Sequence, residues 1–300
     1  MSRQKGGSET LAKLVEQYPT SAFAADAMLQ IGRQRYQEKK WAEAAESFRQ
    51  VVSRFPAYSA ADQAQFLLAD ASAQAGDAEE ARSAYERFLG FFPSSPLVST
   101  VALRLGLMDF EAKNFAQAAV SFTRVLGEST SAEVRAAARY DLAMCHRQLG
   151  DAATARTELA QYREEFPHAA QSADAAYQLA DLAESDGDLE AASRGFQEAL
   201  ALRPRAALAA EIGYRLGRTR ERQKDVTGAL RAYREASEAT GGNEPFRLSA
   251  LARLAALHEQ RHEYTLAVAA YRDIVANTRD RELRAAAESR LNQLAALTRK

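Results

Sequence analysis

Apolar residues along the chain recur at spacings of three and four, which is the spacing of one face of a helix. In residues 105–125 two such stripes follow each other, the first through Leu105 and Phe110 and the second through Phe115 and Phe122. A short polar segment separates the two stripes. The pattern predicts a helix, a tight turn and a second helix that packs against the first.

This two-helix pattern occurs seven times along the chain. Its clearest mark is a large aliphatic residue followed by a small one, and successive marks are 37 residues apart except for a last interval of 38. The marks are Ile31-Gly32, Leu68-Ala69, Leu105-Gly106, Leu142-Ala143, Leu179-Ala180, Leu216-Gly217 and Leu254-Ala255. A period of this size predicts a solenoid, because one helix pair cannot bury its apolar faces alone and must pack against the next pair.

We therefore expect an all-α solenoid of stacked antiparallel helix pairs, with four segments. Residues 1–7 are polar and contain glycine, and they are expected to form a disordered start. Residues 8–19 resemble the second helix of a truncated repeat, residues 20–280 contain the seven repeats, and residues 281–300 are expected to form a C-terminal capping helix. Because the chain begins inside a repeat, we expect it to be a piece of a longer protein.

The composition fits a helical protein and argues against several other classes. Apolar residues make up 47% of the chain, with only 15 glycines and 7 prolines. Lys plus Arg is 39 and Asp plus Glu is 40, so the net charge of −1 gives no general attraction to nucleic acid or to an anionic membrane. No apolar run is long enough to span a membrane. Cys145 is the only cysteine, and we interpret it as a small buried apolar side chain.

We call the equivalent positions of successive repeats a row. These rows resemble the tetratricopeptide repeat, which has a large and a small residue in its first helix, alanine and an aromatic residue in its second, and proline at the exit. The usual period of that family is about 34 residues, so the repeats here are longer. The extra residues lie in exits such as 55–59 and 92–96. Such long exits are similar to those of bacterial outer-membrane assembly lipoproteins and Tol-Pal-associated periplasmic proteins. The resemblance implies a right-handed superhelix in the periplasm or at the outer membrane, with a cytoplasmic location as the alternative.

The resemblance also implies that the first helices line a concave groove that binds a peptide or helix of another protein. Groove residues would lie three positions before, one position after and four positions after the small residue. The residues expected to contact the partner are Phe66, Leu103, Leu107, Phe110, Tyr140, Met144, Arg147, Tyr177, Tyr214 and Arg218. Aromatic and methionine side chains are usual anchors of such surfaces. The alternative interpretation is that these apolar residues pack inside the protein or that the convex face binds.

A zinc-dependent hydrolase is a second hypothesis. Residues 258–262 match the HExxH pattern, in which His258 and His262 would bind the metal and Glu259 would activate water. In the repeat, however, His262 stands at the turn position that Gly76 and Gly187 occupy elsewhere. We therefore expect the helix to end there and the ordinary repeat to continue, so the metal site is disfavoured.

A binder of nucleic acid or another polyanion is a third hypothesis. Arg215, Arg218 and Arg222 share one face of the sixth repeat, which could bind phosphates. Glu221 and Asp225 lie among them, and this favours a solvated, salt-bridged surface. The first hypothesis is thus a non-catalytic scaffold that binds protein partners and uses no metal or cofactor.

Overall fold

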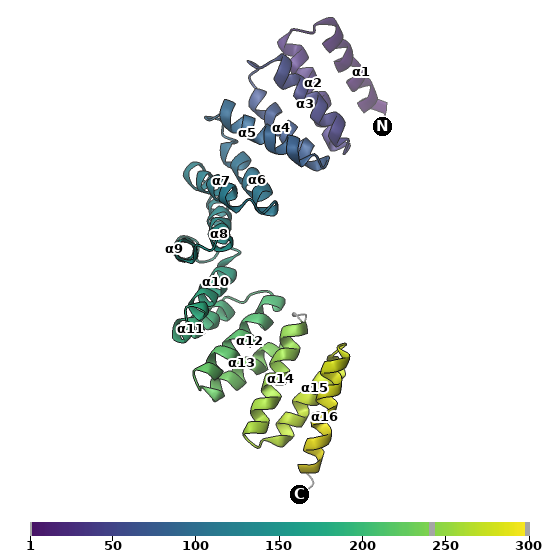
Figure 1. Ribbon diagram of the computed structural model, residues 1–300. Coiled ribbons are helices and arrows are strands. Elements are labelled where there is room, and N and C mark those ends of the chain that lie inside the picture. The colour runs from purple at the N-terminus through teal and green to yellow at the C-terminus, as the bar shows by residue number, and fades with distance from the viewer. Residues whose placement is uncertain (1, 240–243, 298–300) are drawn as a thin grey trace. The chain divides into compact units, whose positions relative to one another are not determined.

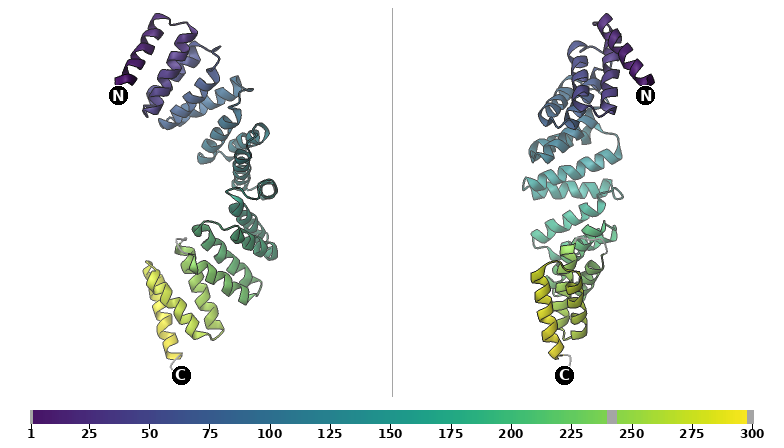
Figure 2. Two further views of the ribbon diagram at one scale, coloured as in Figure 1. Left: turned by 180° about the vertical axis from the view of Figure 1, so that it is seen from behind. Right: turned by 90° about the vertical axis from the view of Figure 1, so that its right-hand side faces the viewer.

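The computed structural model describes residues 2–239 and 244–297, and every regular element within them is a helix (Figure 1). This confirms the predicted all-α solenoid of helix pairs. The chain divides into two compact units, residues 1–151 and residues 152–300. Within each unit the helices pack in sequence order, each against the next, as the two further views in Figure 2 show.

Unit 1 contains eight helices within its described residues. They are α1 (Ser2–Gln17), α2 (Ala22–Gln37), α3 (Trp41–Arg54), α4 (Ala61–Gln74), α5 (Ala78–Phe91), α6 (Val98–Glu111), α7 (Phe115–Glu128) and α8 (Ala132–Gln148). The even-numbered helices are the first helices of their pairs. Helices α3, α5 and α7 are the second helices that follow α2, α4 and α6.

Unit 2 continues the same alternation. Its helices within the described residues are α9 (Ala152–Glu165), α10 (Ser172–Ser185), α11 (Leu189–Ala201), α12 (Ala206–Arg222), α13 (Val226–Glu238), α14 (Glu244–Gln260), α15 (Tyr264–Asn277) and α16 (Arg281–Leu297). Helix α16 occupies the segment predicted to form a cap, of which residues 298–300 lie outside the described part. Ala287 and Leu294 of α16 are buried, so this helix covers the last pair.

Helix α1 differs from the sequence prediction. It begins at Ser2 and therefore includes residues 2–7, where a disordered start was expected. Val15 of α1 packs against the core of unit 1 and so anchors the helix. Once a helix is nucleated, each further residue gains a backbone hydrogen bond, which lets it extend through Gly6 and Gly7.

The small residues of the pattern lie where the two helices of a pair approach most closely. A Cβ atom added at Gly106 of α6 would lie only 2.8 Å from the ring of Phe122 on α7. Ala118, one turn before Phe122, is completely buried. Dense packing at this crossing leaves no room for a larger side chain. The small residues of the first helix and the alanine and aromatic residues of the second are therefore the contact between the two helices of each pair.

The turn inside each pair depends on one residue in the left-handed backbone region. The φ angles at Gly76, Gly150 and Gly187 are +84°, +80° and +81°, as expected for glycines that end a helix. The same turn position in the other pairs is occupied by Lys39, Lys113, Lys224 and His262, with φ between 60° and 63°. The turn geometry is thus kept even where glycine is absent.

Candidate partner-binding surface

The predicted groove residues of unit 1 lie on three consecutive first helices. Phe66 is on α4, Leu103, Leu107 and Phe110 are on α6, and Tyr140, Met144 and Arg147 are on α8. We call the six uncharged members of this set the apolar strip. Leu107 is 38% exposed, and the other five are half-buried.

Two rings of the apolar strip pack against the second helix of their own pair. The Phe66 ring centroid lies 6.3 Å from that of Tyr85, and the Phe110 centroid lies 5.3 Å from that of Phe115, edge to face. These contacts hold the two rings in place. Leu107 lies one turn from Phe110 and is the member of the strip most open to contact.

An exposed apolar side chain by itself is common on protein surfaces. Val120 on α7, for example, is 72% exposed. Leu107 differs from Val120 because its neighbours along the first helices are apolar as well. The apolar strip is therefore the candidate partner-binding surface of unit 1.

The first helices of unit 2 carry glutamates, Glu184, Glu221 and Glu259, in the row that holds Phe110 in unit 1. Three arginines each reach back to acids on the preceding first helix. Arg215 of α12 pairs with Asp181 and Glu184 of α10, Arg253 of α14 with Glu221 of α12, and Arg290 of α16 with Glu259 of α14. We call these pairs the arginine–acid ladder.

Tyrosines complete the hydrogen bonding of the arginine–acid ladder. The Tyr271 hydroxyl donates to Glu259 at 2.6 Å, and the Tyr233 hydroxyl donates to Glu221. Burial and the hydrogen bond to Glu259 raise the pKa of Tyr271, so its phenol stays protonated and continues to donate. The acids of the ladder are therefore satisfied within the protein.

The three predicted groove residues of unit 2 have different surroundings. Tyr177 is only 8% exposed and donates a hydrogen bond to Glu211 at 2.5 Å. Tyr214 is half-buried, with its ring centroid 5.8 Å from that of Phe246. Arg218 is exposed and makes no hydrogen bond or ion pair with any residue that the structure describes. Among the three, Arg218 presents the most surface to a partner.

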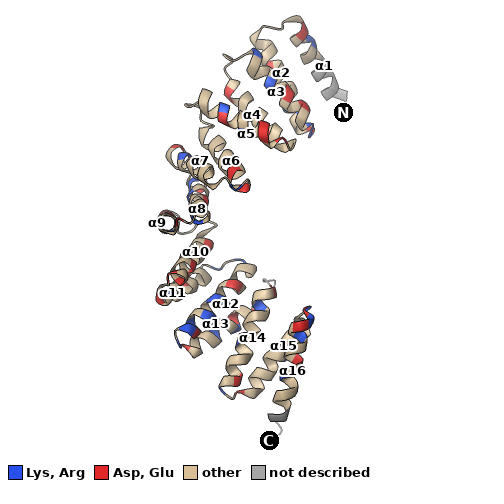
Figure 3. Cartoon of the chain, viewed as in Figure 1, with Lys and Arg blue, Asp and Glu red and all other residues tan. Residues whose placement is uncertain are grey.

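The arginines of the sixth repeat are largely neutralised by acids. Arg215 Nη2 lies 2.8 Å from Glu184 Oε2, and Arg222 Nη1 lies 3.4 Å from Glu184 Oε1. Arg220 donates to the carbonyl oxygen of Gly228 at 3.1 Å. Figure 3 shows acidic and basic residues interspersed along these helices. This arrangement agrees with a salt-bridged surface and argues against a polyanion site.

Asp141 on α8 is a charged residue that sequence reasoning did not single out. Its carboxylate is half-buried and makes no hydrogen bond or ion pair with any residue in the described part of the chain. Burial raises the pKa of Asp141 to about 6. Cys145, one turn further on, is fully buried, and its thiol pKa is raised by burial and then by the Asp141 charge.

The sequence contains a signal that could have identified Asp141. It stands two positions before the small residue of its repeat, where other repeats carry Arg104, Arg215, Arg253 and Arg290. An acid in a row otherwise rich in arginine is a visible exception. It was missed because this row lies beside the three rows to which the family resemblance directed attention.

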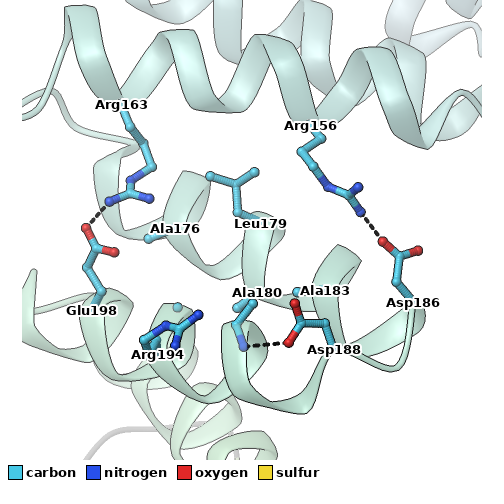
Figure 4. Close-up of a pocket in the computed structure, with 12 residues that line it drawn as sticks. Arg156, Arg163, Ala176, Leu179, Ala180, Ala183, Asp186, Asp188, Arg194 and Glu198 are labelled. Carbon is cyan, nitrogen blue, oxygen red and sulfur yellow. Dashed lines mark hydrogen bonds and ion pairs between the residues drawn. The ribbon is translucent and has the colours of Figure 1, made fainter.

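Unit 2 also contains a hollow of about 420 Å³ between α9, α10 and α11 (Figure 4). Its floor is formed by small or aliphatic side chains of α10 and α11, namely Ala176, Leu179, Ala180, Ala183 and Ala191. Two ion pairs cross its rim, Arg163 with Glu198 and Arg156 with Asp186. The charged side chains thus bridge the helices above an apolar floor.

One residue of α9 that lines the hollow departs from its row. Arg163 stands in the row that holds Leu89, Leu126 and Leu200 in other second helices. Its guanidinium extends to the rim and leaves part of α10 uncovered. Leu179 is consequently half-buried, whereas Leu216 at the same position in the next repeat is 2% exposed.

The HExxH segment does not have the geometry of a zinc site. Helix α14 ends at Gln260, and His262 lies in the turn with φ of 60°. His258 is 3% exposed, and its Nδ1 lies 2.6 Å from Glu263 Oε2. Glu259 is held by Tyr271 and Arg290. Among the described residues no group of three or more His, Cys, Asp or Glu side chains is arranged to hold a metal ion.

Comparison with known families agrees with this architecture. Tetratricopeptide repeat families match residues 109–172, and residues 177–244 and 214–282. These matches together span more than half of the sequence, and the chain belongs to the tetratricopeptide repeat family. The family described as outer membrane lipoprotein matches residues 28–138, which lie within unit 1. None of the curated proteins matches the chain.

Solved structures share the fold at low sequence identity. The C-terminal part of a tetratricopeptide repeat protein from Cytophaga hutchinsonii is 14% identical, with a TM-score of 0.62 over 81% of this chain and 92% of that one. PilF from Pseudomonas aeruginosa is 17% identical, with a TM-score of 0.52 over 75% and 95%. YrrB, a tetratricopeptide repeat protein with an unusual peptide-binding site, is 17% identical, with a TM-score of 0.51 over 66% and 94%.

The tetratricopeptide repeats define a protein-interaction scaffold. Solenoids of this type offer extended surfaces to their partners. Among the residues that the structure describes, no helix is long and apolar enough to cross a membrane.

Proposed function

We propose that the chain is a non-catalytic scaffold that binds a peptide or helical segment of another protein on the apolar strip of unit 1. The observation that carries this proposal is the exposure of Leu107 among the half-buried apolar residues of the strip. In unit 2 the row of Phe110 holds Glu184, Glu221 and Glu259, the acids of the arginine–acid ladder, whose charges are already paired. The apolar strip is therefore the first-helix surface that gains most from being covered.

The mode of binding follows from the residue types in the strip. Leucine, phenylalanine, tyrosine and methionine side chains accept apolar anchors from a partner segment with little specificity for backbone conformation. Such anchors contribute most where they are surrounded by packed side chains that exclude water. The half-buried rings of Phe66 and Phe110 supply that surrounding.

We further propose that the protein acts in the bacterial cell envelope, at the outer membrane or in the periplasm. The match of residues 28–138 to the outer membrane lipoprotein family supports this location. That match contains four of the six residues of the apolar strip. The peptide-binding site named for YrrB supports a peptide or helical segment as the ligand class.

Two other functions receive less support from the structure. A zinc hydrolase would need His258 and His262 on one helical face, whereas His262 lies in a turn beyond the end of α14. A polyanion binder would need several free arginines in the sixth repeat, whereas Arg215 and Arg222 are paired with Glu184 and, of the three arginines on this face, Arg218 alone has no partner among the described residues.

The proposal is tested by crosslinking in the source cells, followed by purification of the tagged protein from the envelope fraction. Wild type is compared with Leu107→Glu, and Val120→Glu on α7 serves as the control for adding a charge at an exposed apolar position. Circular dichroism first establishes that all three proteins are folded.

A partner that is recovered with wild type and Val120→Glu but lost with Leu107→Glu supports the apolar strip as the binding surface. A buried charge disfavours association because the carboxylate loses its hydration without gaining a partner. If the same partners are recovered with Leu107→Glu, the strip is not the binding surface.

A further inference from the structure

Asp141 lacks a charge pair that three arginines of the same row make in unit 2. Two positions before the small residue, Arg215, Arg253 and Arg290 each cross to an acid on the preceding first helix. The acceptor lies 31 or 32 residues earlier in the sequence. On α8 of unit 1 the residue at this row position is Asp141, and the residue 31 positions earlier is Phe110. Both the donor and the acceptor of the ladder are thus missing there.

The missing pair leaves a carboxylate beside the apolar strip. Tyr140 and Met144, one and three positions from Asp141 on α8, belong to the strip, and the repeat register sets Phe110 of α6 opposite it. The carboxylate is half-buried and unpaired within the described residues. An ionised carboxylate removed from water without a counter-charge is unfavourable. The raised pKa of Asp141 has the same cause.

A partner can remove this unfavourable burial by supplying the missing cation. Leu107 is exposed one turn before Phe110. Because the repeat register sets Phe110 opposite Asp141, a partner segment that covers Leu107 and continues towards α8 would meet Asp141. An arginine or lysine in that part would form the pair that Arg253 and Glu221 form within unit 2. Charge pairs of this kind set the specificity and orientation of a bound segment.

We propose that the segment bound on the apolar strip is basic as well as apolar, with an arginine or lysine that pairs with Asp141 next to a large apolar side chain that covers Leu107. This inference rests on the proposed function and adds the chemical class of the partner. It requires a protein segment that carries positive charge at one defined position.

The test begins with a randomised peptide library displayed on phage and selected on the full chain. Selected peptides are then synthesised, and their affinities are measured by fluorescence polarisation. The variants are Asp141→Asn, the conservative Asp141→Glu, Leu107→Ser in the strip, and Glu79→Gln. Glu79 is an exposed acid in the first turn of α5, so its substitution removes one negative charge away from the strip.

We expect the selected peptides to share an arginine or lysine beside a leucine, phenylalanine or methionine. Asp141→Asn should weaken their binding about tenfold or more, whereas Asp141→Glu and Glu79→Gln should retain most of it. Replacing the basic residue of the peptide by norleucine should weaken binding to wild type but not to Asp141→Asn. This double-mutant cycle isolates the interaction between the two charges.

The two proposals fail in different ways. Selection of acidic or uncharged peptides, or unchanged affinity with Asp141→Asn while Leu107→Ser abolishes binding, overturns the inference about charge and leaves the strip as the site. Unchanged affinity with Leu107→Ser overturns the proposed function itself. A library that yields no binding peptide overturns both.

Discussion

At the scale of single residues, the burial of Asp141 links the stability of the protein to pH. The folded-state pKa of about 6 lies above the ordinary value of 3.8. The folded protein therefore binds a proton more tightly than the unfolded chain, and lowering the pH through 6 towards 3.8 removes the unfavourable burial of charge. Above pH 6 the carboxylate is charged in both the folded and the unfolded state, so the burial of its charge destabilises the folded state to the full extent.

Asp141→Asn should consequently stabilise the free protein at neutral pH. We expect a gain of about 1–3 kcal/mol in the free energy of unfolding at about pH 7.5, and almost no difference from wild type at about pH 4. Urea denaturation followed by circular dichroism at the two pH values measures both quantities. Equal stability of the two proteins at neutral pH would show that Asp141 is well solvated in the folded state.

Features of single residues were predictable where they follow from the position of the residue in the repeat. They were not predictable where they depend on the side chains that face the residue from adjacent helices. The position of His262 in the turn followed from its alignment with Gly76, and its φ of 60° confirms it. The burial of Tyr177 and the pairing of Arg215 depend on which side chains face them across adjacent helices. The sequence of one helix does not contain that information. The binding role of Leu107 remains a prediction.

At the scale of elements, α9 departs from the pattern of the other second helices at the position beside the hollow. The row position held by Leu89 and Leu200 elsewhere is Arg163, and the hollow beside α10 results. The exposed Arg163–Glu198 ion pair contributes little to stability, because solvent screens it. An aliphatic residue at this position would instead cover Leu179.

Arg163→Leu should therefore raise the free energy of unfolding. We expect a gain of about 1 kcal/mol, because the new side chain fills part of the hollow and restores the row found in other repeats. Thermal unfolding of Arg163→Leu is compared with that of Arg234→Leu, in which an exposed arginine of α13 is replaced in the same way. A midpoint for Arg163→Leu no higher than that of the control would mean that leucine does not reach the floor of the hollow.

Element boundaries were less predictable at the start of the chain than within the repeats. The helix pairs could be located in the sequence because the residues of each row form packing contacts between helices. Residues 2–7 contain no row positions, so composition alone predicted disorder, whereas α1 begins at Ser2. Backbone hydrogen bonding extends a helix beyond its last packed residue, and a pattern of side chains does not report this.

At the scale of the whole molecule, the two units differ in the first-helix row that holds Phe110 in unit 1 and Glu184, Glu221 and Glu259 in unit 2. The apolar strip lies in unit 1, and the arginine–acid ladder lies in unit 2. The sequence predicted the all-α repeat architecture, because a regular period records contacts between neighbouring repeats. It did not predict the division after residue 151, which falls inside the fourth repeat where the rows continue unchanged.

The most direct test of the central claim is site-specific photocrosslinking of the protein in its native cells. A benzoylphenylalanine replaces Leu107 in the apolar strip or, as the control, Leu266 on α15 of unit 2, which is 47% exposed. We expect a defined protein to be crosslinked from position 107 and not from position 266, and mass spectrometry to locate the crosslink in a segment that contains a basic residue. Crosslinking from position 266 alone, or equally from both positions, would contradict the account.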